Sequence, residues 1–399
     1  MLWSPAAAVC LSLGGSDMRG TLGILTGGGD CPGLNAVIRA VTKTATSRHG
    51  FAVIGFADGF AGVVEDRWQK LGFGDASDIL TRGGTILGTS NRADPFDYVL
   101  GAERRDRSAD AVAVLARCGI DTLVVVGGDG SLSIAHRLIA EHGVSIIGVP
   151  KTIDNDLRGT DRTFGFDSAV AIVAEAVDRI HSTAQSHHRV MIVEVMGRYA
   201  GWIALHGGMA SGADVILIPE IPYRIARVAE VCRERNLRGS RSSIIVIAEG
   251  ACEQGGTRSV QKLVPGSHDP VRLGGVGYRL AAQLEREVEA EVRVTVLGHL
   301  QRGGVPTAFD RVLATRFGAA AVEMAAGGRS GMMAALRGDS IVAVPIAEAV
   351  AGRRLVAPGD PLVEAGRGLC VSFGDELPGT PVRPRSESGP GSTAPSPSG

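Results

Sequence analysis

An α/β fold in two domains, with mainly parallel sheets flanked by helices, is predicted from three observations. The chain has 399 residues, more than one hydrophobic core usually organises. Short apolar runs alternate with segments of helical periodicity, which is the pattern of parallel strands joined by right-handed crossovers. Two of these runs end in clusters of glycine and acidic residues. Such strand ends are where an α/β sheet usually binds its ligand.

Eight strands are expected where hydrophobic residues run together between turn residues. Each run is rich in Val, Ile and Leu and has the length of a buried strand. The expected strands are residues 22–26, 51–56, 122–126, 144–149, 190–195, 215–218, 244–248 and 292–297.

Helices are expected between these strands. Val170, Val173 and Val177, for example, repeat at helical spacing along one such segment. The helices that matter most for function are those next to the glycine-rich and acidic clusters. They are residues 34–46, 132–141 and 167–186.

The smaller domain, residues 166–301, is expected as an insertion into the larger one, residues 20–165 plus 302–374. Both ends of the chain are expected to lie outside the two domains. Residues 1–19 form an extension that ends near Met18, a candidate for the true start. Residues 375–399 are rich in Pro, Ser, Gly and Thr and too poor in hydrophobic residues to pack, so a disordered tail is expected.

Composition argues against several classes of protein. Basic and acidic residues number 41 and 42, a formal net charge of −1, so nothing favours nucleic acid or an anionic membrane as a partner. No apolar run reaches the roughly eighteen residues that span a membrane. The six cysteines include no C-x-x-C pair, which is typical of reduced cytosolic thiols rather than a disulfide framework or a zinc site. A cytoplasmic protein is expected.

The first glycine-rich loop, residues 26–33, joins an expected strand to an expected helix. Glycines let a phosphate approach backbone N–H groups, and the start of a helix favours an anion. The loop matches neither the dinucleotide-binding G-x-G-x-x-G pattern nor a Walker A motif. Alone, it fits a phosphate contact and a plain tight turn equally well.

The second loop, Gly127-Gly128-Asp129-Gly130-Ser131, also joins a strand to a helix. Asp129 is placed to hold an Mg²⁺ ion that bridges nucleotide phosphates. Gly130 leaves room where a side chain would crowd the α-phosphate. The alternative is an ordinary helix start, capped by Asp129 or Ser131.

Residues 151–156 read Lys-Thr-Ile-Asp-Asn-Asp and directly follow an expected strand. A hydroxyl that attacks a phosphoryl group needs a nearby base, and phosphoryl transfer otherwise depends on positioning and charge neutralisation. Asp154 is the candidate base, and Asp156 is a second carboxylate near the metal ion or the substrate. The alternative is an Asx turn with solvated carboxylates.

Arginines near the ends of expected strands supply positive charge for anions. Arg189 and Arg198 flank one strand, and Arg293 and Arg302 lie near the two ends of another. Arginine presents a fork of donors that matches phosphate. A single arginine more often forms a surface ion pair, but four near strand ends favour an anion site.

Taken in order, these motifs resemble the phosphofructokinase family, in its bacterial six-phosphofructokinase form. The resemblance extends from about residue 21 to residue 374. It implies two Rossmann-like domains, with ATP on the larger and fructose 6-phosphate held mainly by the smaller. The implied reaction is a step of glycolysis: Mg²⁺-dependent phosphoryl transfer from ATP to the 1-hydroxyl of fructose 6-phosphate, which gives fructose 1,6-bisphosphate and ADP.

The resemblance also implies roles for individual residues on the donor side. Thr152, Asp154 and Asp156 would surround the attacking hydroxyl, with Asp154 as the proton acceptor. The segment that leads to Arg92 is one residue longer than in the family, where an arginine contacts the transferring phosphate. The residues implied for the nucleotide are Gly29, Arg92, Gly128, Asp129, Gly130 and Ser131, with Asp129 on the metal ion.

A second set of residues is implied for the sugar phosphate. Family members lend two arginines, here Arg189 and Arg293, to the site of a neighbouring subunit, so the resemblance implies a homo-oligomer, namely a tetramer. The remaining sugar-phosphate residues are Met196, Gly197, Arg198, Glu249, His299 and Arg302, of which Arg198 also touches the transferring group.

Two positions bear on the identity of the phosphoryl donor. Family members that use pyrophosphate have a lysine at the position of Lys151 and an aspartate at the position of Gly130. The aspartate would repel and crowd an α-phosphate, whereas glycine admits ATP. This chain combines the lysine with the glycine. Because excluding a nucleotide requires an obstacle, ATP is the expected donor and pyrophosphate is the alternative.

Two further alternatives come from other classes of protein. A kinase of the NAD kinase type shares the Gly-Gly-Asp-Gly turn but lacks the later motifs. A non-catalytic sugar-phosphate sensor could use the same fold, although Asp129, Asp154 and Arg198 are all present. Turnover of fructose 6-phosphate separates the main hypothesis from both.

Overall fold

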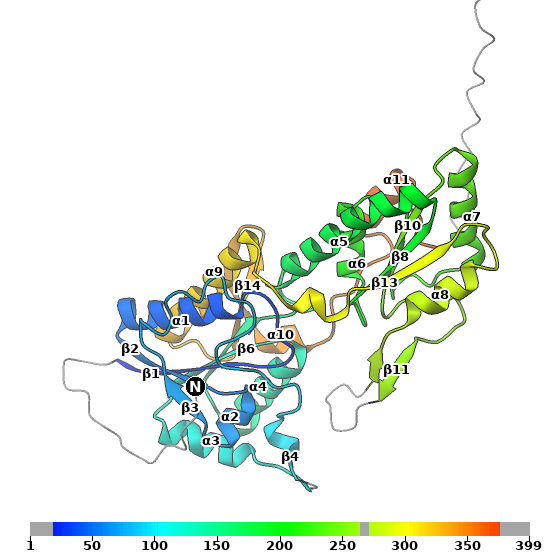
Figure 1. The fold of residues 1–399 in the computed structure, drawn as a ribbon. Coiled ribbons are helices and arrows are strands. Elements are labelled where there is room, and N and C mark those ends of the chain that lie inside the picture. The colour runs from blue at the N-terminus through cyan, green and yellow to red at the C-terminus, as the bar shows by residue number, and fades with distance from the viewer. Residues whose placement is uncertain (1–18, 102, 264–270, 376–399) are drawn as a thin grey trace, which may run out of the picture.

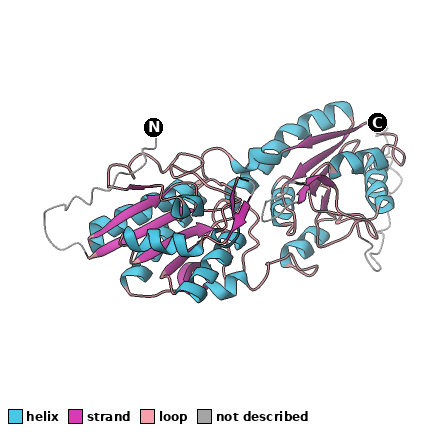
Figure 2. Ribbon diagram, turned by 90° about the horizontal axis from the view of Figure 1, so that it is seen from below, coloured by secondary structure: helices cyan, strands magenta, loops and turns pink. Residues whose placement is uncertain are grey.

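Two mainly parallel sheets, each with helices on both faces, lie side by side in an elongated molecule (Figure 1). The structure is a computed structural model that describes residues 19–101, 103–263 and 271–375. This architecture confirms the predicted α/β class. Figure 2 shows the two groups of strands from below, each between its own helices.

The larger sheet has seven strands in the order β15-β14-β7-β6-β1-β2-β3. Its five central strands run parallel, and β3 and β15 pair antiparallel at the two edges. The strands are β1 (Gly20–Thr26), β2 (Phe51–Phe56), β3 (Trp68–Lys70), β6 (Thr122–Gly127), β7 (Ile146–Pro150), β14 (Met332–Arg337) and β15 (Ser340–Pro345).

The smaller sheet has four parallel strands in the order β13-β8-β10-β9. Two antiparallel hairpins stand apart from both sheets. The strands are β8 (Val190–Val195), β9 (Val215–Leu217), β10 (Ser243–Ala248) and β13 (Val292–Val296), and the hairpins are β4 (Tyr98–Leu100) with β5 (Glu103–Arg105) and β11 (Val260–Leu263) with β12 (Val271–Leu273).

Helices cover each sheet because alternate strand residues point to opposite faces and are buried on both. On the larger sheet, α1 and α9 cover one face, and α2, α3, α4 and α10 cover the other. On the smaller sheet, α5 and α6 cover one face, and α7 and α8 the other. The helices are α1 (Leu34–His49), α2 (Phe60–Val64), α3 (Ser108–Arg117), α4 (Asp129–His142), α5 (Phe166–His187), α6 (Trp202–Ala210), α7 (Ile225–Leu237), α8 (Val276–Leu284), α9 (Ala308–Ala326), α10 (Ile346–Val350) and α11 (Pro361–Gly368), with 3₁₀ turns η1 (Pro95–Asp97) and η2 (Gly298–Arg302).

One hydrophobic core continues from the α1/α9 face of the larger sheet to the α5/α6 face of the smaller one. Phe164 and Phe166 belong to it and are fully buried at the start of α5. The two sheets are therefore joined by packed side chains as well as by the chain, which limits how freely the ligand site between them can open.

All eight expected strands are present, with bounds that differ by up to two residues. The expected helix over residues 132–141 begins earlier, at Asp129, so the last three residues of the second glycine-rich loop already form its first turn. Seven further strands in the described part of the chain were not expected: β3, β4, β5, β11, β12, β14 and β15. The hairpins β4–β5 and β11–β12 are short, and their pairing depends on local contacts that a period-2 pattern does not reveal.

The last helix differs from the predicted domain boundaries. Residues 302–374 were assigned to the larger domain, but α11 packs on α6, and Ser372 forms a bridge with Val215 of the smaller sheet. The buried side chains of Val363 and Phe373 explain this, since they complete the core beneath α6. Residues 1–18 and 376–399 lie outside the described residues, and with them most of the predicted extension and tail. No helix in the described part of the chain is long and apolar enough to cross a membrane.

Candidate active site

A cavity of about 800 Å³ opens where the carboxyl ends of strands from both sheets meet. Residues from the larger sheet line one side, and residues that follow β8, β10 and β13 line the other. The predicted site residues that line it are Gly29, Arg92, Gly128, Asp129, Gly130, Ser131, Lys151, Thr152, Asp154, Asp156, Met196, Arg198, Glu249, His299 and Arg302.

Two basic side chains hold the first glycine-rich loop through its backbone carbonyls. Lys151 is buried, and its Nζ donates a hydrogen bond to the carbonyl of Gly29. Arg302 donates from Nη1 to the carbonyl of Asp30 at 3.0 Å. A side chain at Gly29 would begin 2.7 Å from Arg302 Nη1. The absence of a side chain at Gly29 therefore leaves room for the loop and the arginine to approach closely. Burial lowers the pKa of Lys151.

Asp129 is the first residue of α4, and the preceding Gly128 is the N-cap without any side-chain hydrogen bond. Neither Asp129 nor Ser131 is therefore the N-cap residue of this helix. Asp129 Oδ1 accepts a hydrogen bond from the backbone N–H of Gly130 at 2.8 Å. Its Oδ2 accepts one from Arg353 at 2.7 Å. The carboxylate faces the cavity at a helix N-terminus, where the macrodipole favours negative charge.

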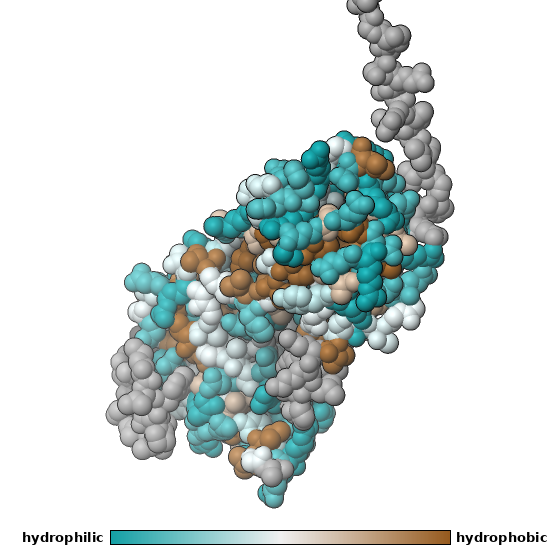
Figure 3. Space-filling view, turned by 45° about the vertical axis from the view of Figure 1, so that its right-hand side comes forward, coloured by the Kyte–Doolittle hydropathy of each residue, from teal (hydrophilic) through white to brown (hydrophobic). Residues whose placement is uncertain are grey.

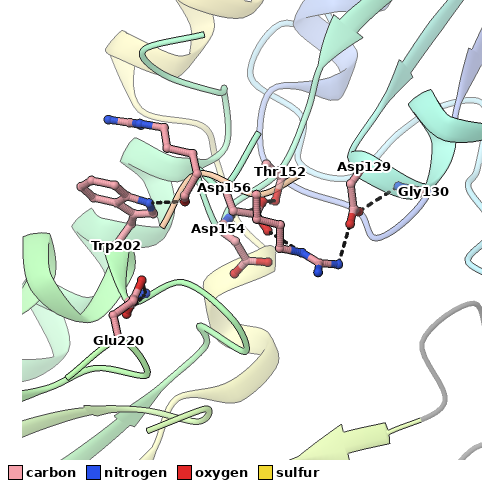
Figure 4. Close-up of polar contacts among 10 residues, drawn as sticks. Asp129, Gly130, Thr152, Asp154, Asp156, Trp202 and Glu220 are labelled. Atoms are coloured by element: carbon pink, nitrogen blue, oxygen red, sulfur yellow. Dashed lines mark hydrogen bonds and ion pairs between the residues drawn. The ribbon is translucent and has the colours of Figure 1, made fainter. Parts of the chain in front are cut away.

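The turn after β7 places Thr152, Asp154 and Asp156 together (Figure 4). The backbone N–H of Asp154 donates to Thr152 Oγ1 at 3.1 Å, and Thr152 Oγ1 lies 3.5 Å from Asp156 Oδ1. Asn155 makes the turn possible, since its φ is +53° and its side chain accepts from Thr163 N at 3.1 Å. Asparagine tolerates this left-handed conformation better than most residues.

Burial sets the protonation of the acidic side chains in the cavity. It raises the pKa of Asp154, against the charges of Arg302 and Arg198. Burial, and then the charge of Asp154, raises the pKa of Asp156 to about 7 and that of Glu249 to about 7. The Asp156 side chain is only 13% exposed, so the alternative of solvated carboxylates is wrong there. Carboxyl groups with pKa values this far above normal are candidates for proton transfer.

The turn after β8 brings the basic side of the cavity into place. Gly197 has a φ of +138°, and a Cβ there would lie 2.9 Å from the carbonyl of Ala200, so only glycine fits. Gly197 itself does not line the cavity; it shapes the turn that presents Met196 and Arg198 to it. Glu249 enters from the neighbouring strand β10, directly after Ala248.

Two predicted residues, Arg189 and Arg293, lie away from the cavity. Both form ion pairs with Glu291, near the edge strand β13 of the smaller sheet. Within one chain they contact neither the acidic cluster nor the glycine-rich loops.

Residues that were not predicted also line the cavity. Tyr199 directly follows the Met-Gly-Arg motif, and Arg353 arrives from the far end of the chain, 224 residues from its partner Asp129. Phe60 and Ile134 add apolar side chains to the lining, and Arg104 adds a cation. Tyr199 could have been found from its neighbour Arg198, but nothing in the sequence around Arg353 points to a site.

The metal-ligating side chains of the cavity fit a divalent cation that takes most of its ligands from bound phosphate groups. Within residues 19–101, 103–263 and 271–375, no three His, Cys, Asp or Glu side chains form a group that could hold a metal ion alone. On the side of the second glycine-rich loop, Asp129 brings one carboxylate to the cavity. This suits Mg²⁺, which typically takes one or two carboxylates and completes its shell with phosphate oxygens and water.

Comparison with known proteins agrees with this geometry. The family model for phosphofructokinase matches residues 21–325. An ATP-dependent 6-phosphofructokinase of Chloroflexus aggregans is 51% identical over 366 residues, which cover 89% of this chain and 98% of the relative. A pyrophosphate–fructose 6-phosphate 1-phosphotransferase of Amycolatopsis methanolica is 50% identical over 337 residues, which cover 84% of this chain and 96% of the relative.

Solved structures give the same result. The phosphofructokinase of Pichia pastoris in the T-state superposes with a TM-score of 0.73 at 34% identity, over 84% of this chain. This chain spans 38% of that longer one. A pyrophosphate-dependent phosphofructokinase of Nitrosospira multiformis, at 21% identity, shares the fold with a TM-score of 0.74. The sequence motifs, the cavity between two sheets and these matches lead to one conclusion: the chain belongs to the phosphofructokinase family.

Proposed function

We propose that this chain is a 6-phosphofructokinase, which transfers a phosphoryl group from ATP to the 1-hydroxyl of fructose 6-phosphate. The observation that carries the proposal is the position of Asp154. It lies between the glycine-rich loops of the larger sheet and the Arg198, Glu249 and His299 side of the cavity, so a donor and a sugar phosphate can meet at its carboxylate. Figure 4 shows Asp154 and Asp156 in the middle of the site, with Asp129 on one side and Trp202 and Glu220 on the other.

In the proposed mechanism, Asp154 accepts the proton of the attacking 1-hydroxyl. Its raised pKa favours this role because a base with a pKa closer to neutral holds the proton better in the transition state. Thr152 and Asp156 orient the hydroxyl, and Arg198 and Arg302 neutralise charge on the phosphoryl oxygens. Mg²⁺, held by Asp129, would offset the negative charge of the donor phosphates.

ATP is the proposed donor, although relatives of nearly equal identity carry the ATP and the pyrophosphate names. Two features of the chain support ATP. Gly130 brings no side chain toward the donor, and the apolar side chains of Phe60 and Ile134 in the cavity lining suit a nucleoside better than a bare phosphate. The Nζ of Lys151 is hydrogen-bonded to the carbonyl of Gly29, so this lysine supports the loop.

A homo-oligomer, namely a tetramer, is the proposed assembly. The support is the edge strand β13, which ends in the exposed apolar side chain of Val296 and is followed by the exposed side chain of Leu300. An exposed strand edge with apolar side chains is usually covered by another chain. Hydrophilic residues cover most of the face shown in Figure 3, and hydrophobic ones gather in patches on it. The cytoplasmic location stays a prediction.

The test is formation of fructose 1,6-bisphosphate by the purified chain, with fructose 6-phosphate, MgCl₂ and either ATP or pyrophosphate. Turnover with ATP supports the proposal, and turnover with pyrophosphate alone replaces the donor. An Asp154→Asn variant purified in the same way controls for contaminating host enzyme. Tight binding of fructose 6-phosphate without turnover would favour the sensor, and phosphorylation of NAD instead would favour the nucleotide-cofactor kinase.

A further inference from the structure

Arg353 belongs to a short stretch, residues 352–356, which we name the crossover segment because the chain passes through it from α10 to α11. On the side of the larger sheet, this segment is tied to the turn that carries the catalytic carboxylates. The backbone N–H of Arg354 donates to the carbonyl of Asp156 at 2.7 Å, and Arg353 forms an antiparallel bridge with Leu157.

On the side of the smaller sheet, buried groups hold the same segment. The indole Nε1–H of Trp202 donates to the carbonyl of Arg354 at 2.9 Å. The backbone N–H of Val356 donates to Glu220 Oε1 at 2.9 Å, and Glu220 also accepts from the backbone of Gly201. Trp202 and Val356 are almost fully buried. The crossover segment is therefore fixed to both sheets, at the boundary between them.

The side chain of Arg353 reaches from this anchored backbone into the donor side of the cavity. Its Nη2 lies 2.7 Å from Asp129 Oδ2, and its Nε lies 3.6 Å from Asp156 Oδ2. Its guanidinium carbon is 4.1 Å from the centre of the Tyr199 ring. One planar cation thus links the carboxylates at the ends of β6 and β7 while an aromatic ring supports it.

This link matters because each oxygen of Asp129 already has a partner within the chain. Oδ1 accepts from Gly130, and Oδ2 accepts from Arg353. The pair is partly exposed, with Arg353 at 38% and Asp129 at 44%, so it is weak enough for another cation to compete with it. Arg353 therefore both orients Asp129 and opposes the binding of a cation there.

We propose that Arg353 is a positioning residue of the donor site, which holds Asp129 and Asp156 in register from a segment anchored in both sheets. The proposal rests on the proposed function, because it assigns Asp129 to the donor's cation and Asp156 to the substrate side. Arg353 acts through these two carboxylates, so its loss should affect the donor side of the reaction more than the binding of the sugar.

The variants are Arg353→Gln, Arg353→Lys and a matched control, Arg337→Gln. Arg337 pairs with Glu348 at 3.1 Å on the same part of the chain and is similarly exposed, but it does not line the cavity. Two readouts are taken: steady-state kinetics for each substrate, and donor-free binding of Mn²⁺ measured by electron paramagnetic resonance. The Mn²⁺ readout needs no turnover.

For Arg353→Gln we expect two changes in opposite directions. The kcat should fall roughly tenfold, with the KM for fructose 6-phosphate unchanged, because misplaced catalytic groups slow transfer. Mn²⁺ should bind roughly two- to fivefold more tightly, because the competing cation is gone. Arg353→Lys should restore the Mn²⁺ affinity but not kcat, since an ammonium restores the charge without the planar fork. Arg337→Gln should behave as the unmodified chain.

The proposal is overturned if Arg353→Gln matches the unmodified chain in both readouts, or if kcat, Mn²⁺ affinity and melting temperature fall together as in simple unfolding. A Trp202→Phe variant keeps the ring but removes the N–H that holds Arg354. This variant should lower kcat, as Arg353→Gln does. An unchanged kcat would overturn the role of the crossover segment. If the unmodified chain turns over neither donor, the proposed function fails, and the Mn²⁺ comparison still decides whether Arg353 competes at Asp129.

Discussion

Replacing Asp154 with asparagine isolates the chemistry proposed for the site. Asparagine has nearly the same shape, and the backbone hydrogen bond from residue 154 to Thr152 Oγ1 does not depend on the side chain. The variant therefore loses a proton acceptor and one negative charge while the turn stays in place. A general base contributes roughly 10²- to 10⁴-fold to a rate, so kcat should fall by that factor. This corresponds to about 2.7–5.4 kcal/mol in the barrier.

The same substitution should leave ground-state binding nearly intact. The KM for fructose 6-phosphate should stay close to that of the unmodified chain, because the base acts mainly in the transition state. The charge of Asp154 helps to raise the pKa values of Asp156 and Glu249. Its removal should therefore lower both pKa values, and any acidic limb of the residual pH–rate profile should move to lower pH.

The assay is initial-rate formation of fructose 1,6-bisphosphate across pH 5 to 9, with saturating donor and Mg²⁺. Asp110→Asn serves as a control, because Asp110 is an exposed carboxylate paired with Arg107 outside the cavity. A kcat for Asp154→Asn within a few-fold of the unmodified chain would refute the assignment of Asp154 as the base. A rise in KM with unchanged kcat would instead assign Asp154 to sugar binding.

Three further substitutions test other parts of the site. Gly130→Asp should weaken turnover with ATP far more than any turnover with pyrophosphate, since the added carboxylate repels and crowds an α-phosphate; equal losses with both donors would contradict this. Glu249→Gln should be less destabilising at pH 8 than at pH 5, as measured by urea unfolding. Burial raises the pKa of Glu249 from 4.5 to about 7, so the unmodified chain loses stability as pH rises through that window, whereas glutamine does not ionise. Asn155→Ala should lower the free energy of unfolding by about 1–3 kcal/mol, because the left-handed φ and the bond to Thr163 N both disfavour alanine; an unchanged urea midpoint would show that the turn is held by other contacts.

The acidic residues of the site, which were predicted from sequence, lie close to the ends of their strands. Asp129 and the 151–156 segment directly follow apolar runs that form β6 and β7, and these strands are neighbours in the sheet. Strand order was not needed to bring them together, because successive parallel strands of a β-α-β unit are usually adjacent and end on the same side. Local hydrophobic patterning and glycine content were therefore enough to locate the acidic side of the cavity.

Contacts between residues that are distant along the chain could not be predicted from such local patterns. The placement of α11 against the smaller sheet depends on buried contacts of Val363 and Phe373 that no periodicity reveals. The approach of Arg302 to the first glycine-rich loop spans 272 residues. In both cases the pairing is selected by how whole elements pack, which is a property of the assembled core.

Local patterns thus determined the fold class and the acidic residues of the cavity. These patterns are the hydrophobic periodicity of the strands and helices and the turn residues next to the strands. The tertiary structure alone decided that Lys151 supports the Gly29 loop, that Arg353 joins Asp129 and Asp156, and that Arg189 and Arg293 both pair with Glu291 within the chain. The physical reason is that long cationic side chains can reach many partners. Which carboxylate or carbonyl they meet depends on the packing of distant segments, and sequence spacing does not record it.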